Sequence, residues 1–221
     1  NSCSCNRNFG LYEKIKGENM KEKNLMLSGK LYKAADDELK QDFLYAKKIT
    51  RQINLTAEDE SEKRQLLFKQ LFKSTGNNFY IEPPFHCDYG KNISIGENFY
   101  ANYDCIIIDV CNVNIGNNVF LAPRVCIYTA AHPIDAEVRN TGLEYGKEIN
   151  IGNNVWVCGN VVINPGVTIG DNVVIGSGAV VTKNIPSDVV AAGNPCKVIR
   201  KITGEDKLKW HKLAQEYFSS K

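Results

Sequence analysis

The chain has 221 residues, of which 43% are hydrophobic, so it can bury the core of one large domain or two small ones. Its formal net charge of +2 argues against bulk nucleic-acid binding, so any anion site has to be local. No apolar run approaches the roughly 18 residues of a membrane span, and the N-terminus lacks the apolar segment of a signal peptide. We therefore expect no nucleic-acid partner and no membrane partner.

The eight cysteines do not have the spacing of a metal site or of a disulfide framework. The chain has no paired CxxC motif, and Cys3 and Cys5 form only a lone CxC. Most of the others lie inside a repeat, where a cysteine is typically a small buried apolar residue. This use of cysteine is typical of a reducing cytosol, so we expect a cytoplasmic protein that requires no metal.

The first elements expected along the chain are a leader and a helix. Residues 1–19 are polar and without periodicity, which predicts a loosely ordered leader. Residues 36–55 carry one apolar stripe, and Asp36, Asp37 and Glu38 lie at its start, where the helix dipole favours negative charge. The stripe consists of Leu39, Phe43, Ala46, Ile49 and Ile53.

A second helix is expected to follow. Thr56 and Asp59 resemble a capping box, and apolar residues behind it lie one turn apart. Those residues are Leu67 with Leu71 and Phe68 with Phe72. The helix is expected to end near Gly76, so we predict that 20–76 forms a helical hairpin.

Within 77–202, apolar residues recur in pairs with a step of six. Alternate side chains of a strand point the same way, so a pair at i and i+2 followed by a corner describes one flat wall. Three walls make a triangular coil of about 18 residues, and stacked coils pair their strands in parallel. The pairs are most regular at Ile149 and Ile151, Val155 and Val157, Val161 and Ile163, Val167 and Ile169, Val173 and Ile175, and Ala179 and Val181.

The corners of such coils need tight, partly left-handed backbone. Glycines are expected to supply it, together with the Asn and Asp residues that follow several of them. The glycines concerned are Gly96, Gly116, Gly152, Gly170 and Gly176. A stack of antiparallel hairpins would show longer and less regular spacing. The pattern does not fix the hand of the coil, although the general crossover rule predicts a right-handed one.

Two segments depart from the repeat. The stretch "TAAHPIDAEVRNTGLEYGK" (129–147) interrupts it and is expected to protrude as a loop. Thr203 and Asp206 repeat the Thr-x-x-Asp pattern of a helix start, which predicts a C-terminal helix over 203–221.

Six stretches carry a resemblance to a known family: "IGNNVWVCGNVVINPGVTIGDNVVIGSGAVVTKNIP" (151–186), "SGKLYKAADDELKQD" (28–42), "IEPPFHCDYGKNISIGENFYANYDC" (81–105), "IDVC" (108–111), "TAAHPID" (129–135) and "VVAAGNPCKVIRKI" (189–202). They resemble the hexapeptide-repeat acyltransferases, and most closely the sugar O-acetyltransferases of the maltose type. The resemblance runs from Met20 to Ile202. It implies a left-handed parallel β-helix, against the crossover rule, and acetyl transfer from acetyl-CoA to a sugar hydroxyl, the 6-hydroxyl of a maltose or glucose unit.

His132 is the candidate catalytic base, and it lies in the protruding loop. Loops on a rigid scaffold commonly carry function, and a neutral imidazole can take a proton from a hydroxyl. Taken alone, a loop histidine is more often an ordinary surface residue, but "TAAHPID" resembles the catalytic loop of the family. The resemblance implies direct transfer in a ternary complex. It also suggests Asn102 in the site around the reacting groups, where developing charge needs a fixed donor.

The resemblance also implies residues for the two substrates. Carboxylates suit paired sugar hydroxyls because they only accept hydrogen bonds. The acceptor candidates are Asp88, Asn102, Asp109, Glu144 and Asp36, although Asp36 is equally suited to capping a helix. Asp88 stands where a galactoside-type chain has Ser, which favours maltose or glucose. The acetyl-CoA candidates are Gly159, Ser177, Thr182, Lys183, Lys197 and Arg200.

The resemblance further implies a homotrimer, with the histidine loop of one subunit facing a coil edge of the next. Three alternatives stay open at this point. One is an acetyltransferase of this fold acting on a galactoside, an antibiotic or another oligosaccharide. Another is a non-catalytic β-helix scaffold. The third is a metal enzyme such as a γ-type carbonic anhydrase, but His86 and His211 make no three-histidine constellation with His132.

Overall fold

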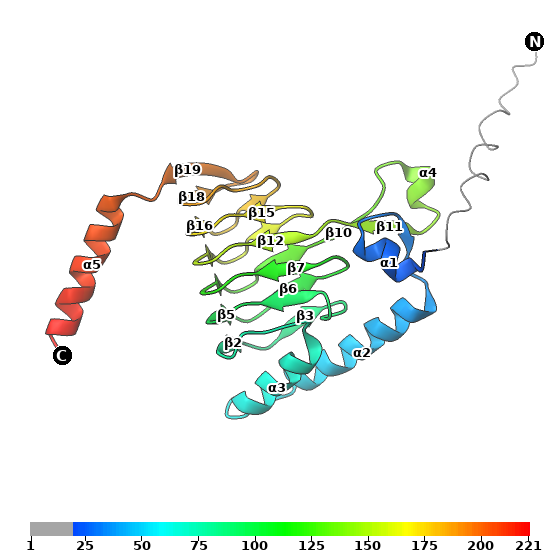
Figure 1. The fold of residues 1–221 in the computed structure, drawn as a ribbon, viewed down its shortest axis with the longest axis horizontal. Helices are drawn as coiled ribbons and strands as arrows, with labels where there is room; N and C mark the ends of the chain where they lie inside the picture. Colours follow the sequence, from blue (N-terminus) through cyan, green and yellow to red (C-terminus); the bar gives the residue numbers. More distant parts are fainter. Residues whose placement is uncertain (1–19) are drawn as a thin grey trace, which may run out of the picture.

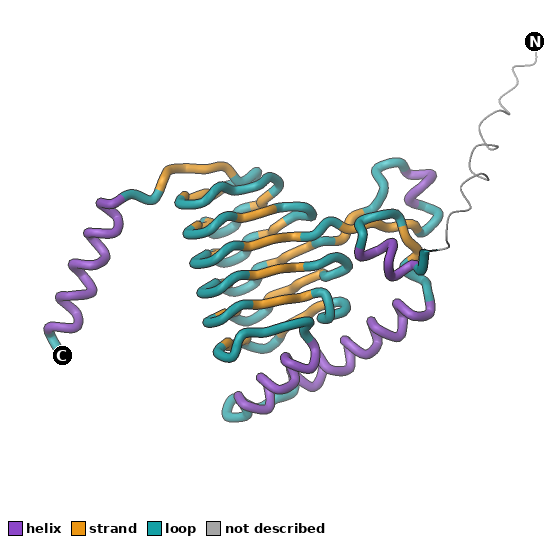
Figure 2. Tube along the Cα trace, viewed as in Figure 1, coloured by secondary structure: helices purple, strands orange, loops and turns teal. Residues whose placement is uncertain are grey.

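The computed structural model describes residues 20–221, so the predicted leader at 1–19 lies outside the described residues. Figure 1 shows about six stacked coils, with two helices packed against the first coil, a loop projecting to one side, and a last helix standing apart. The strands of successive coils form the three walls of the stack, and short loops join them (Figure 2).

Three parallel sheets form these walls. Sheet I contains β4 (Ile93–Ile95), β7 (Val113–Ile115), β12 (Ile149–Ile151) and β15 (Thr168–Ile169). Sheet II contains β2 (Phe79–Ile81), β5 (Phe99–Ala101), β8 (Phe120–Leu121), β13 (Trp156–Val157), β16 (Val173–Ile175) and β18 (Val189–Ala192), with β19 (Lys197–Lys201) added antiparallel at its edge. Sheet III contains β3 (Phe85–Cys87), β6 (Cys105–Ile108), β9 (Cys126–Tyr128), β14 (Val162–Ile163) and β17 (Val180–Val181).

The step of six builds the interior as predicted. Each of the twelve paired residues between Ile149 and Val181 is at most 3% exposed, because alternate residues of each wall point inward. Register is strict: Ile151 pairs with Ile115 on one side and with Ile169 on the other. All pairing between successive coils is parallel, which excludes the hairpin alternative.

The corner glycines act differently from the prediction. None of the five has a positive φ; the left-handed positions belong to asparagines two residues after four of them. These are Asn98, Asn118, Asn154 and Asn172, with φ of 54–56°. Their amides form a ladder, as where Asn118 Nδ2 donates to Asn154 Oδ1 at 3.1 Å. The glycines are needed because the next coil leaves no room for a Cβ, which at Gly116 would lie 2.7 Å from Asn153 Oδ1.

The N-terminal helices close the first coil. They are α2 (Asp37–Asn54) and α3 (Ser61–Leu71), and α2 buries the predicted stripe except Phe43, which is 36% exposed. The predicted capping box at Thr56 and Asp59 is wrong. The helix α3 begins five residues after Thr56, with Glu60 at its N-cap, while the Thr56 hydroxyl accepts a hydrogen bond from Arg64 Nε.

The segment before α2 was not expected to form elements of its own. It forms a short helix α1 (Glu22–Leu27) and a strand β1 (Tyr32–Lys33). The strand β1 pairs with β11 (Leu143–Gly146), which pairs with β10 (Ala130–Ala131), so the loop 129–147 shares a small antiparallel sheet with the N-terminal segment. The loop also contains α4 (Ala136–Arg139).

The predicted C-terminal helix is present as α5 (Gly204–Ser219), and the Thr203 and Asp206 side chains form its capping box. Figure 1 shows that α5 stands clear of the coils. Its base is held by the Arg200 guanidinium, which donates to both carboxylate oxygens of Asp206 at 2.6 and 3.0 Å.

Close coil stacking predicts a steric cost for Gly152→Ala. The added Cβ would lie 2.5 Å from Asp171 Oδ1 and 2.9 Å from the carbonyl carbon of Gly170 in the next coil. We expect the free energy of unfolding to fall by about 1–3 kcal/mol, measured by chemical denaturation. Gly204→Ala is the control, because within 20–221 no non-neighbouring atom lies within 4 Å of its Cβ position. Equal midpoints for both variants would contradict this account of the corners.

Candidate functional site

The predicted site residues divide between two corners of the coil stack, at either end of sheet III. Corner II–III joins sheet II to sheet III and includes 102–104, 122–124, 158–160 and 176–178. Corner III–I joins sheet III to sheet I and includes 88–92 and 109–112; the loop 129–147 leaves from it. Corner II–III carries Asn102, Gly159 and Ser177, and the corner III–I side carries Asp88, His132, Glu144, Thr182 and Lys183.

The face of sheet III between these corners is apolar on its outer side. Ile106, Cys126, Val162 and Val180 lie in register up the stack. Their neighbours Ile107, Ile127, Ile163 and Val181 fill the interior, so the first four point outward. All four are half-buried. Each of these coils contributes one outward apolar side chain to a column along the stack. Such an apolar surface is suited to contact with another subunit.

A cleft of about 500 Å³ lies at corner III–I. It is lined by Tyr32, Ala34, Leu39, Lys40, Phe43, Leu44, Asp88, Tyr89, Val110 and Glu144. The helix α2 supplies one wall, and β1, β11 and the corner supply the rest. Aromatic and aliphatic surfaces with a few carboxylates are a suitable lining for a small polar molecule that also has apolar faces.

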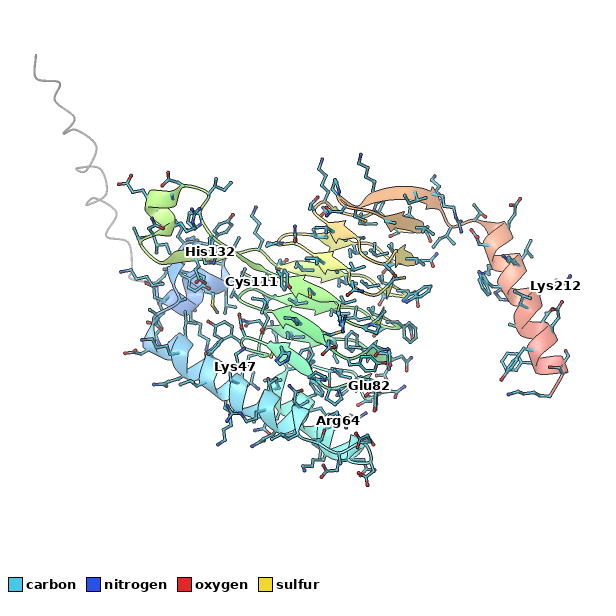
Figure 3. All side chains as sticks on the ribbon, turned by 180° about the vertical axis from the view of Figure 1, so that it is seen from behind. Lys47, Arg64, Glu82, Cys111, His132 and Lys212 are labelled. Carbon is cyan, nitrogen blue, oxygen red and sulfur yellow. The ribbon has the colours of Figure 1, made fainter. Side chains whose placement is uncertain are left out.

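His132 directly follows β10, the strand that pairs with β11 beside this cleft. Ala130 pairs with Gly146 and Ala131 with Tyr145. Tyr32 pairs with Glu144 from the other side, and its hydroxyl donates to Glu144 Oε2 at 2.9 Å. Directly opposed residues share a face of a sheet, so Tyr32 and Glu144 form one row, and His132 comes just past the last residue pair of β10. Figure 3 shows His132 on the projecting loop beside the N-terminal segment.

Lys47 was not predicted, yet it is the cation that holds Asp88. Its Nζ donates to the backbone oxygen of Cys87 at 2.9 Å and lies 3.5 Å from Asp88 Oδ1. Burial raises the pKa of Asp88, and the Lys47 charge acts in the opposite direction. Lys47 also lies over the Phe43 ring, 4.6 Å from its centroid. No sequence pattern marks Lys47, because 41 residues separate it from Asp88.

Asp109, predicted to contact the acceptor, lies beneath the cleft and is not among its lining residues. It is 0% exposed, so it presents no oxygen to the cleft. Its Oδ1 accepts hydrogen bonds from the backbone N–H groups of Asp88 and Tyr89 at 3.0 and 2.9 Å. Burial raises the pKa of Asp109 to about 7. Asp109 therefore positions the backbone that carries Asp88, and the next residue, Val110, lines the cleft.

Asp36 is likewise a structural residue here. Its Oδ1 accepts from the backbone N–H groups of Glu38 and Leu39 at 3.0 and 3.2 Å, which makes it the N-cap of α2. Helix capping is the role that the sequence left open as the alternative to sugar binding. Asp36 is absent from the lining of the cleft.

Asn102 lies at the other corner, beside a smaller cleft on sheet II. Its Oδ1 accepts from the backbone N–H of Tyr103 at 2.8 Å, which orients the side-chain amide. The strand register aligns Asn102 with Ala122 and Cys158 up the stack. Gly159 follows Cys158, and its carbonyl accepts from the backbone N–H of Gly178 at 2.9 Å. At Gly178, no non-neighbouring atom of the described chain lies within 4 Å of the Cβ position, so this end of the corner is open.

The cations predicted for acetyl-CoA are exposed, but one is already paired. Lys183 and Lys197 are exposed, as are Thr182 and Ser177. Arg200 is bound by Asp206, and this arginine is the first cause that lowers the pKa of Asp206 to about 2. In the described part of the chain, no cluster of three or more His, Cys, Asp or Glu residues is arranged to hold a metal ion. No helix within 20–221 combines the length and apolarity needed to cross a bilayer.

Comparison with known proteins gives two matching family models. They are the maltose acetyltransferase hexapeptide capping motif over residues 25–76 and the bacterial transferase hexapeptide (six repeats) over residues 148–183. The galactoside O-acetyltransferase of Escherichia coli K12 is 46% identical over 189 residues, which span 86% of this chain and 93% of that protein.

Solved structures agree with this relationship. A crystal structure of a maltose O-acetyltransferase from Clostridium difficile 630 is 59% identical with a TM-score of 0.83, and the match covers 83% of this chain and 98% of that one. A galactoside acetyltransferase in complex with coenzyme A is 47% identical with a TM-score of 0.83, covering 86% and 94%. The predicted family and the left-handed parallel β-helix are thereby confirmed. With 46% identity to a relative that it spans almost entirely, this chain belongs to the hexapeptide-repeat acetyltransferases.

Proposed function

We propose that this protein transfers the acetyl group of acetyl-CoA to a sugar hydroxyl, the 6-hydroxyl of a glucose or maltose unit. The observation that carries the proposal is the hydrogen-bonded pair of Tyr32 and Glu144 in a cleft that also contains the Asp88 carboxylate, with His132 directly after β10, the strand that pairs with β11. This arrangement offers a proton acceptor next to groups that can bind several hydroxyls. Relatives named maltose and galactoside O-acetyltransferases support the choice of a sugar.

The proposed reaction is direct transfer in a ternary complex. A ring nitrogen of His132 takes the hydroxyl proton while the sugar oxygen bonds to the thioester carbonyl carbon. The carbonyl oxygen then carries negative charge, and the Asn102 amide donates a hydrogen bond to it. Collapse of this intermediate breaks the carbon–sulfur bond, and the imidazolium returns its proton to the coenzyme A thiolate. Glu144 orients His132 and stabilises its charged form.

A cysteine nucleophile is not required in this scheme, and burial works against one at several thiols of the described chain. Burial raises the pKa of both Cys105 and Cys111 to about 11, and it raises the pKa of Cys158. A thiol needs a lowered pKa to act as a nucleophile at neutral pH. The described cysteines are all free. We propose a cytoplasmic location on the pattern of cysteine use in the sequence.

For the acceptor, we propose that Asp88 and Glu144 accept hydrogen bonds from neighbouring sugar hydroxyls while Tyr89 and Phe43 cover an apolar sugar face. The Asp88 side chain is 21% exposed, so it can reach a ligand in the cleft without leaving Lys47. A galactoside is the alternative acceptor, supported by the galactoside O-acetyltransferase relative.

For acetyl-CoA, we propose that the pantetheine arm lies along corner II–III past Gly159 and Ser177. A galactoside acetyltransferase of known structure is in complex with coenzyme A, which supports this co-substrate. Thr182, Lys183 and Lys197 are the proposed phosphate contacts. Arg200 would have to exchange Asp206 for a phosphate to join them.

The division of the site between two corners supports a homotrimer. A carbonyl oxygen cannot meet Asn102 and His132 on the same chain, because sheet III separates their corners. If the apolar face of sheet III turns toward a threefold axis, corner III–I of one subunit approaches corner II–III of the next. Each of three active sites would then combine His132 from one subunit with Asn102 from its neighbour.

His132→Ala tests the proposed base. We expect acceptor-dependent thiol release from acetyl-CoA to fall at least about 100-fold, the loss typical of a removed general base. Thermal stabilisation by coenzyme A should persist, since binding is separate from proton transfer. Acceptors should include glucose, maltose, a galactoside and a no-sugar blank. A variant that keeps the full rate would refute His132 as the base.

Mixing two inactive variants tests the shared site. His132→Ala and Asn102→Ala subunits, unfolded and refolded together in equal amounts, should form mixed trimers. If each site takes its histidine from one subunit and its asparagine from the next, about one quarter of the sites combine both intact residues. Thiol release should therefore return to roughly a quarter of the wild-type rate. If both residues come from one chain, the mixture stays as inactive as its components.

Lys47→Met tests the control of Asp88. Burial already raises the pKa of Asp88, and loss of the ammonium should raise this pKa further, because the Lys47 charge lowers it. Sugar binding needs the ionised carboxylate, so it is lost as pH falls through that pKa. The acidic limb of kcat/KM for the sugar should move to higher pH. Lys47→Arg should restore it, and Lys48→Met, one residue along the same helix, should not move it.

A further inference from the structure

We propose that the tip of the projecting loop is an anchor: Ile134 of one subunit docks into the aromatic cleft beside Asn102 of the neighbouring subunit. This inference rests on the shared site proposed above and names the contact that would hold it together. The occupant is a second copy of this chain, through residues 133–138. Its partner surface is a second cleft, away from the one assigned to the sugar.

The loop tip presents a large apolar side chain on a fixed backbone. Ile134 is 95% exposed, two residues after His132. The Arg139 Nη1 donates to the backbone oxygens of Pro133 and Ile134 at 3.0 and 2.9 Å. Asp135 caps the following turn, because its Oδ1 accepts from the backbone N–H of Val138 at 2.9 Å. The tip is therefore ordered by its own contacts while the isoleucine points into solvent, as a preformed contact would.

The receiving cleft has a volume of about 310 Å³ and lies on sheet II next to corner II–III. It is lined by Tyr100, Asn102, Phe120, Leu121, Ala122 and Trp156. The strand register stacks Tyr100, Phe120 and Trp156 on successive coils, and Phe120 and Trp156 are 49% and 52% exposed. An open patch of aromatic side chains is a typical recipient for one protruding aliphatic anchor.

Ile134 and the aromatic cleft would meet in the same arrangement of subunits that brings His132 to Asn102. Acetyl transfer needs His132 near Asn102, and these residues lie at opposite ends of sheet III, so the loop that meets Asn102 has to come from another copy. A loop that carries His132 to that corner also carries Ile134 there. The cleft includes Asn102 itself, so docking of Ile134 would fix the distance between the base and the oxyanion donor.

A photocross-linking experiment tests this contact directly. The full-length protein is made with p-benzoylphenylalanine at position 134, mixed with a ¹⁵N-labelled wild-type preparation and allowed to form mixed assemblies. After irradiation, mass spectrometry should identify a cross-link from position 134 to a peptide containing Phe120 or Trp156 of a differently labelled chain. A cross-link within one chain, a cross-link to another segment, or none at all would overturn the inference.

A double-mutant cycle supplies the functional readout. Ile134→Ala and Trp156→Ala should each lower kcat by about tenfold, and the double variant should lose little more, because both remove the same contact. Leu66→Ala, which truncates another exposed side chain on α3, should leave kcat unchanged. Independent, multiplicative losses would reject the contact. Absence of acetyl transfer in the wild type would instead reject the proposed function, while the cross-link would still report on the docking.

Discussion

The stacking of one coil directly on the next is the constraint on which the rest of the structure depends. Each inward pair must lie over the pair below, and each backbone strand must find its partner in parallel register. The corners then become as crowded as the walls, which is why a Cβ at Gly116 would collide with the next coil while Asn118 and Asn154 share a hydrogen bond. Regular stacking converts a sequence repeat into columns of equivalent positions along the axis.

These columns bring together side chains that lie far apart in the sequence. Asn102 and Cys158 are far apart in the chain, yet they lie in one column, because each follows the strand of sheet II in its own coil. The column is rigid, so it can only present groups at its own edge. A side chain that has to reach beyond its own corner must lie on a segment that leaves the repeat, and the loop 129–147 is the longest such segment. The interruption is therefore the part of the repeat region that is free to carry a base.

The interior could be predicted from the sequence because the same pair of inward apolar residues recurs in every wall. The six pairs between Ile149 and Val181 were identified from spacing alone, and the cap of α5 from Thr203 and Asp206. Contacts between different segments of the chain could not be predicted from the sequence. Nothing near Thr56 shows that Arg64 will use its hydroxyl, and nothing near Asp88 points to Lys47. The prediction gave left-handed backbone to glycines and asparagines alike, and only the asparagines have it, because spacing marks a corner without saying whether backbone twist or close approach dictates each residue.

Burial explains why the carboxylates of this region have different roles although their sequence settings look alike. Asp109 has no exposed surface, so its oxygens are committed to the backbone N–H groups of Asp88 and Tyr89. Asp88, carried by that backbone, keeps a partly exposed side chain and a cation to balance it. A buried acceptor that fixes a loop and an exposed one that the loop presents are complementary, since a ligand-binding carboxylate is useful only if its backbone does not move. The resemblance to known transferases selects the segment, and solvent exposure then decides which of its acids can meet a substrate.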